Sequence, residues 1–103
     1  MATTPKVFYR GAATTNTATT LYTTASTETG IITHIAATNT SASSQTFTIN
    51  VDGISLLSGV SISANTTAFI DLKIPLIASG STKTITGGAS ATSVNLFISG
   101  VTI

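Results

Sequence analysis

Residues 46–51 alternate strictly between polar and apolar side chains, and this two-residue period indicates a half-buried β-strand over residues 45–51. Phe47 and Ile49 are expected to face the interior, with the polar residues between them facing outward. Asp52-Gly53 follows directly, a dipeptide that tolerates the positive φ angles of a type I′ turn. Residues 54–57 then return, so this part of the sequence predicts an antiparallel β-hairpin.

The rest of the chain repeats this pattern in short segments. β-Branched and aromatic residues dominate, and clusters of Gly, Ser, Asn and Asp interrupt them at intervals of roughly eight to twelve residues. No segment combines a helical period with a run of good helix formers. Further strands are expected at residues 6–10, 20–24, 30–38, 60–63, 67–73, 83–86 and 93–103. The predicted fold class is all-β: a single antiparallel β-sandwich of jelly-roll type, with about eight strands.

Proline and glycine add local detail to these strands. Pro75 cannot donate a hydrogen bond to a neighbouring strand, so it is expected at a sheet edge or a bend. Gly87-Gly88 is expected to end its strand, and Gly100 to mark a bulge in the last one.

The chain of 103 residues fits one domain, residues 1–103, which can bury roughly two-thirds of its unfolded surface. Aromatic residues make up 6% and Trp is absent, so the core must consist mostly of Ile, Leu and Val. Residues 1–10 have two interpretations, an extended N-terminal arm or an edge strand. As a strand, they would place Val7 and Tyr9 on one face and Phe8 and Arg10 on the other.

Charged residues are scarce, and this limits what the surface can do. Only 7% of the residues are charged, against about 25% in typical domains, and about a third of the chain is Ser or Thr. Four basic and three acidic residues give a net charge of +1, with no basic patch for nucleic acid or anionic lipid. The chain has no cysteine for disulfides or thiolate metal sites. The composition therefore predicts a protein that is not an enzyme, with no catalytic residue, no cofactor and no metal.

The few titratable groups do not form a recognisable active site. His34, aligned by alternation with Ile32, would need a nucleophile and a carboxylate from elsewhere, so a structural strand histidine is expected. Asp71 and Lys73 share a strand face and are interpreted as a solvated pair at a sheet edge, with a polar pair in a pocket as the alternative. Asp52 is assigned to its turn. No partner is identified for Glu28.

The uncharged strands are expected to be buried, either within the protein or against other protein. Residues 45–51 and 94–98 combine high β-propensity with no charge, which is an aggregation hazard when such segments are exposed. A mean hydropathy of +0.47 with a net charge of +1 gives little electrostatic protection against association. Sheet closure, a homo-oligomer and docking onto a larger assembly all provide cover, and we favour the last two together.

Five stretches of the sequence are similar to known proteins: TTPKVFYRG (3–11), IAATNTSA (35–42), FTINVDGI (47–54), SANTTAFIDLK (63–73) and VNLFISGVTI (94–103). They resemble short structural virion proteins of tailed bacteriophages, either capsid decoration (cement) proteins or small tail and fibre proteins. The resemblance implies a β-sandwich, commonly a homotrimer, that sits on the capsid shell, and it carries over no catalytic residue. The N-terminus lacks the apolar region of a secretion signal, so the expected location is the virion, after synthesis in the host cytoplasm.

The leading hypothesis is a non-enzymatic protein that decorates and stabilises a phage capsid by bridging major capsid subunits. The alternatives are a tail, baseplate or fibre component and, from a different class, a carbohydrate- or receptor-binding module. The expected partner is the major capsid protein or another virion protein. The residues proposed to contact it lie in the N-terminal segment: Pro5, Lys6, Phe8, Tyr9 and Arg10.

Overall fold

The computed structural model describes residues 4–77 and 80–103, and these residues form strands, turns and loops without any helix. No membrane-spanning helix is therefore found in the described residues. The strands are β1 (Thr4–Ala12), β2 (Thr20–Thr23), β3 (Thr29–Asn39), β4 (Gln45–Val51), β5 (Ile54–Ile62), β6 (Thr67–Ile77), β7 (Thr84–Ala89) and β8 (Val94–Thr102).

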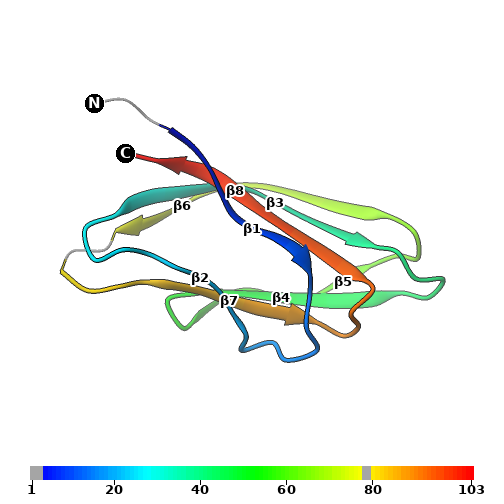
Figure 1. The fold of residues 1–103 in the computed structure, drawn as a ribbon. Helices are drawn as coiled ribbons and strands as arrows, with labels where there is room; N and C mark the ends of the chain where they lie inside the picture. The colour runs from blue at the N-terminus through cyan, green and yellow to red at the C-terminus, as the bar shows by residue number, and fades with distance from the viewer. Residues whose placement is uncertain (1–3, 78–79) are drawn as a thin grey trace.

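The eight strands form two four-stranded sheets that pack face to face (Figure 1). The strand orders are β1-β8-β3-β6 and β2-β7-β4-β5, and every neighbouring pair is antiparallel. This confirms the predicted all-β class, the number of strands and the two antiparallel sheets packed together. β1 lies at the edge of its sheet and pairs only with β8, whereas residues 1–3 of the N-terminal segment lie outside the described residues.

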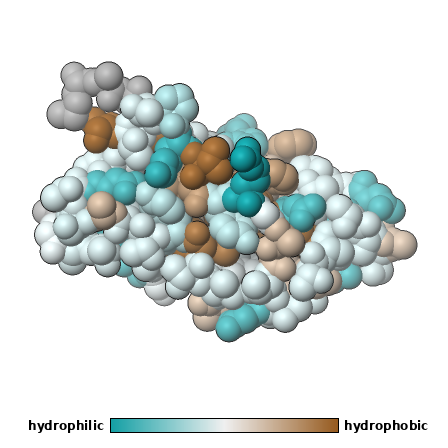
Figure 2. All heavy atoms as spheres, viewed as in Figure 1, coloured by the Kyte–Doolittle hydropathy of each residue, from teal (hydrophilic) through white to brown (hydrophobic). Residues whose placement is uncertain are grey.

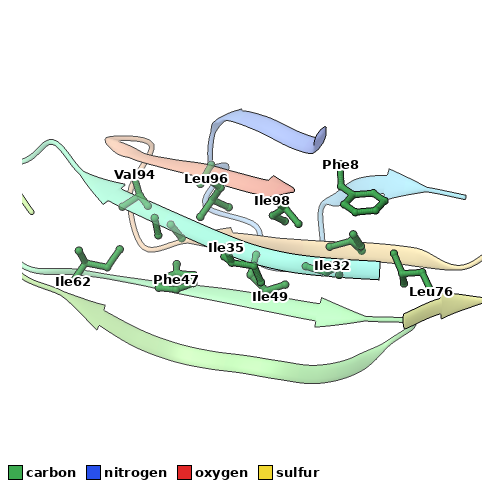
Figure 3. Close-up of a cluster of buried hydrophobic side chains, with 14 residues drawn as sticks. Phe8, Ile32, Ile35, Phe47, Ile49, Ile62, Leu76, Val94, Leu96 and Ile98 are labelled. Atoms are coloured by element: carbon green, nitrogen blue, oxygen red, sulfur yellow. The ribbon is translucent and has the colours of Figure 1, made fainter. Parts of the chain in front are cut away.

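The core lies between the two sheets and is mostly aliphatic, as the composition predicts. Figure 3 shows side chains from both sheets pointing into this layer. Ile35, Leu96 and Ile98 from one sheet are fully buried, as is Ile49 from the other. Phe8 and Phe47 are the buried aromatic side chains of the cluster.

The predicted hairpin is confirmed in the structure. β4 spans the expected residues, and Asp52 (φ 53°) and Gly53 (φ 78°) both adopt positive φ angles at the turn. β5 is longer than predicted, because it continues to Ile62 and absorbs the segment at residues 60–63 that the sequence analysis separated. Pro75 lies in the edge strand β6, as its missing donor requires.

The prediction that Gly87-Gly88 ends its strand is wrong. β7 continues through both glycines to Ala89, and Gly88 pairs with Thr48 on β4. A Cβ atom at Gly87 would collide with the carbonyl oxygen of Thr48. Gly87 therefore permits close approach of the β4 backbone, whereas a Cβ atom at Gly88 would collide with the carbonyl oxygens of Asn16 and Thr14 in the loop between β1 and β2.

The predicted bulge at Gly100 is also wrong, because the extra residues lie in the two strands that flank β8. Gly100 pairs regularly with Lys6 on one side and Ile32 on the other. Beyond it, β1 carries the additional residue Phe8 and β3 carries the additional residue Thr33. The two bulges lie one residue pair apart along β8, on its two sides.

These bulges change which side chains face the core. In β1, Tyr9 pairs with the buried Ile98, so it lies on the inner side together with Phe8, and the predicted alternation is broken. In β3, Ile32 is fully buried, whereas His34 pairs with Ser99 on the outer side. His34 is therefore not aligned with Ile32.

The ring of Phe8 fits against two glycines on the inner side of this sheet. A Cβ atom at Gly100 would lie 3.0 Å from the Phe8 ring and would collide with the carbonyl oxygen of Ile31. A Cβ atom at Gly30 would lie 3.2 Å from the same ring. The ring also contacts Tyr22 from the other sheet edge-on, with centroids 5.0 Å apart.

We expect Gly100→Ala to lower the free energy of unfolding by about 3 kcal/mol, because the methyl group overpacks against the β3 backbone. Gly11→Ala is the matched control in the same sheet, because its Cβ would make only ordinary contacts with the Tyr9 ring. That variant should change stability by less than about 1 kcal/mol. Urea unfolding measures both values, and equal effects would contradict this account of Gly100.

Candidate interaction surface

One face of the β1-β8-β3-β6 sheet points away from the core. Leu96 and Ile98 are buried between the sheets, so the residues next to them along β8 face outward. Residues of the other three strands that pair with these outward-facing residues, directly or through β3, lie on the same outer side. Three rows cross the sheet and together define what we call the outer apolar face. They are Pro5–Val101–Ile31–Pro75, Val7–Ser99–His34–Asp71 and Arg10–Phe97–Ala36–Phe69.

This face exposes large hydrophobic side chains. Phe69 is 71% exposed, Val7 53% and Phe97 38%, and Ile77 at the end of β6 adds another at 56%. Figure 2 shows hydrophobic atoms beside strongly hydrophilic ones over β1 and β8, while most of the visible surface has intermediate hydropathy. Contiguous exposed apolar residues with a few polar ones among them are typical of interaction sites.

The outward face of the other sheet has a different chemistry. Along β4 it presents Thr46, Thr48 and Asn50, as the sequence analysis predicts, and Asn50 pairs with Thr86 on β7. The same row continues at the two sheet edges with Thr20 on β2 and Ser55 on β5. The sandwich thus has one hydroxyl-rich face and one apolar face.

The side chains of His34 and Asp71 are hydrogen-bonded on the outer apolar face. His34 Nδ1 lies 2.8 Å from Asp71 Oδ1, and the Phe69 ring lies 5.8 Å from the imidazole. The sequence analysis paired Asp71 with Lys73 instead, because the contact with His34 spans 37 residues of sequence. The side chains are 35% and 91% exposed, so the pair contributes little to stability.

Ser99, His34 and Asp71 lie side by side on three adjacent strands, the residue types of a hydrolytic triad. Among the hydrogen bonds of the described residues, however, none joins the Ser99 hydroxyl to the imidazole. Of the links in such a triad, only the one between His34 and Asp71 is formed in this part of the chain. The three side chains form a polar patch within the apolar face.

An open depression of about 530 Å³ lies beside this patch. Thr33, Asp71, Leu72 and Lys73 line it, at the point where the pairing of β3 and β6 shifts register. It offers one carboxylate and one ammonium group. Within residues 4–77 and 80–103, no group of three or more His, Cys, Asp or Glu side chains could hold a metal ion.

The five N-terminal residues proposed as partner contacts do not share one surface. Pro5 and Arg10 are exposed and belong to the outer apolar face. Phe8 is only 4% exposed and packs in the core. Lys6 and Tyr9 lie on the inner side and are half-buried, and Lys6 Nζ lies 5.2 Å from the centre of the Tyr22 ring.

Sequence reasoning also missed the partner of Glu28. The Tyr22 hydroxyl donates a 2.6 Å hydrogen bond to Glu28 Oε2, and the other carboxylate oxygen accepts from the backbone N–H of Ala25. Burial of the phenol, reinforced by the hydrogen bond and negative charge of Glu28, raises the pKa of Tyr22 to about 12. The sequence signal for this contact was the separation of only six residues between Tyr22 and Glu28, on the two sides of a turn. Asp52 likewise gains a partner, because Lys83 Nζ lies 3.4 Å from its Oδ2.

The raised pKa of Tyr22 predicts a loss of stability in strong alkali. The folded protein holds the phenol proton more tightly than the unfolded chain, whose tyrosine pKa is near 10. The resulting stabilisation is complete below pH 10 and is lost as the pH rises towards 12. Urea unfolding of the protein and of Tyr22→Phe between pH 9 and 12 measures this, and the stability difference between them should shrink with pH. A difference that does not change with pH would contradict the assignment.

No protein-family model matches the chain, and no curated protein shows significant sequence similarity to it. Function must therefore be argued from the two unlike faces of the sandwich and the residues that form them.

Proposed function

We propose that this protein is a non-enzymatic structural component of a phage virion, which decorates the capsid and stabilises it by bridging major capsid subunits. The observation that carries the proposal is the chemical difference between the two faces of the sandwich. The hydroxyl-rich face suits contact with water, and the face with Val7, Phe69 and Phe97 suits contact with protein.

We also propose that the fold is a jelly roll. Support comes from the strand pairing, in which β1 pairs with β8, β2 with β7, β3 with β6 and β4 with β5. This is the pattern of one long antiparallel hairpin rolled into two sheets. The jelly roll is a recurrent architecture of viral capsid proteins, and the proposed class of function agrees with it.

In the proposed mechanism, the protein self-associates as a trimer and each assembly spans a junction between capsid subunits. Added buried area at each junction opposes rupture of the shell by packaged DNA. The end of the sandwich where β1 begins and β8 ends is the proposed contact with the shell, since Thr4 pairs there with Thr102. Pro5 lies exposed near this end.

The test is binding of the purified protein to expanded heads of the phage that encodes it, prepared without this protein. We expect saturable binding and a higher temperature of head disruption. Bovine serum albumin at the same concentration serves as a control for nonspecific protection. Heads that neither bind the protein nor gain stability would refute capsid decoration.

The copy number in intact virions separates the shell from the tail. Decoration predicts a number comparable with that of the major capsid protein, measured by quantitative mass spectrometry, whereas a tail, baseplate or fibre component would be present in few copies. A carbohydrate-binding role has one favourable feature, the exposed rings of Phe69 and Phe97 beside Asp71, because aromatic rings can stack on sugars. Specific hits in a glycan-array screen would support that alternative.

A further inference from the structure

We infer that the outer apolar face is where copies of this chain meet, around a threefold axis parallel to the strands, with β1 of each copy beside β6 of the next. This inference deepens the proposed function, because it rests on the proposed self-association and names the surface that performs it. It does not depend on which shell the protein decorates.

The two edges of this face carry complementary groups. Arg10 lies on edge strand β1, and Asp71 lies on the opposite edge strand β6, one row away along the sheet. An assembly that places β1 beside β6 of a neighbour brings the Arg10 guanidinium within reach of the neighbour's Asp71. Along β6, Asp71 lies closer than Lys73 to Phe69, the residue in the same row as Arg10. The nearest charged group that the neighbouring copy offers to Arg10 is therefore negative. A contact that places β1 against β1 would instead gather arginines, which favours the unlike edges.

The width of the sheet fits three copies. Four strands about 4.8 Å apart make a sheet roughly 19 Å wide. If three such sheets form the sides of a triangular prism, the centre of each sheet lies about 5.5 Å from the threefold axis. This distance is close to half of the ~10 Å that separates two sheets packed face to face. The side chains nearest the axis would then come from the central strands β8 and β3, namely Phe97, Val101 and Ile31.

The area of this face is modest, because each copy in a trimer shares it between two neighbours. Strands of nine residues span roughly 30 Å, so the flat area of this face is on the order of 600 Å² before the relief of its side chains is counted. A standard interface buries about 800 Å² per partner. Burying this face would cover Val7, Phe69 and Phe97, while the hydroxyl-rich face would remain outside.

Disulfide trapping tests the arrangement directly, because the chain has no cysteine of its own. In Arg10→Cys/Phe69→Cys the two sulfurs lie in one row at opposite edges of a sheet. They are about 14 Å apart within one copy, beyond the roughly 7 Å Cα separation a disulfide permits, so every link must join two copies. Mild oxidation should give a closed trimer on a non-reducing gel. Only monomers, only dimers or an open ladder would overturn the inference.

The matched control uses the equivalent row of the other sheet. Thr20 and Ser55 lie at opposite edges, joined through Thr86 and Asn50. Thr20→Cys/Ser55→Cys should stay monomeric on the gel under the same oxidation. Equal trapping of both cysteine pairs would show random collision and would overturn the inference.

Charge reversal tests the proposed edge contact independently. Arg10→Glu and Asp71→Lys should each raise the trimer dissociation constant at least tenfold in sedimentation velocity, and the double variant should restore assembly. His34→Gln controls for loss of the His34–Asp71 contact and should leave the trimer intact. Failure of the double variant to recover would overturn the edge contact.

The outcomes separate this inference from the proposed function. A protein that binds heads but remains monomeric in solution keeps the decoration role and refutes the trimer surface. A trimer trapped through residues 10 and 69 that binds no head keeps the surface and refutes the role in the capsid.

Discussion

The structure depends on two bulges beside one glycine. β1 and β3 each carry one more residue than the stretch of β8 between them, and both insertions fall just past Gly100. The extra residue in β1 lets Phe8 and Tyr9 both turn inward, so the Phe8 ring can rest on Gly30 and Gly100. Where Gly100 lies, β8 and the β3 backbone approach so closely that no side chain fits between them.

The same bulges decide what the outer apolar face displays. After the extra residue, Arg10 returns to the side of Val7, whereas uninterrupted alternation would have turned the guanidinium towards the core. In β3, the bulge at Thr33 turns His34 outward and lets Ile35 fill the interior. One local irregularity, repeated across the sheet, therefore supplies both a well-packed core and the polar groups of an otherwise apolar surface.

Sequence reasoning was accurate where structure depends on neighbours along the chain. The limits of β4 and the turn at Asp52-Gly53 follow from local alternation and turn chemistry, and both were predicted. The bulges were not, because they exist only relative to the pairing with β8, and pairing over such distances leaves no local pattern. The contact between His34 and Asp71 was missed for the same reason. Of the five N-terminal residues proposed as partner contacts, Phe8 is the one that the structure buries, and its burial was not predicted because it accompanies the bulge.

The hydroxyl-rich face has a consequence for how the protein meets its surroundings. Its polarity comes from threonine and serine, in a chain with four basic and three acidic residues. Ionic strength acts on proteins largely through screening of charges, and here there is little charge to screen. A particle coated with this face would keep much the same surface in fresh water, in brine and inside a cell, since uncharged hydroxyl groups bind water in all three.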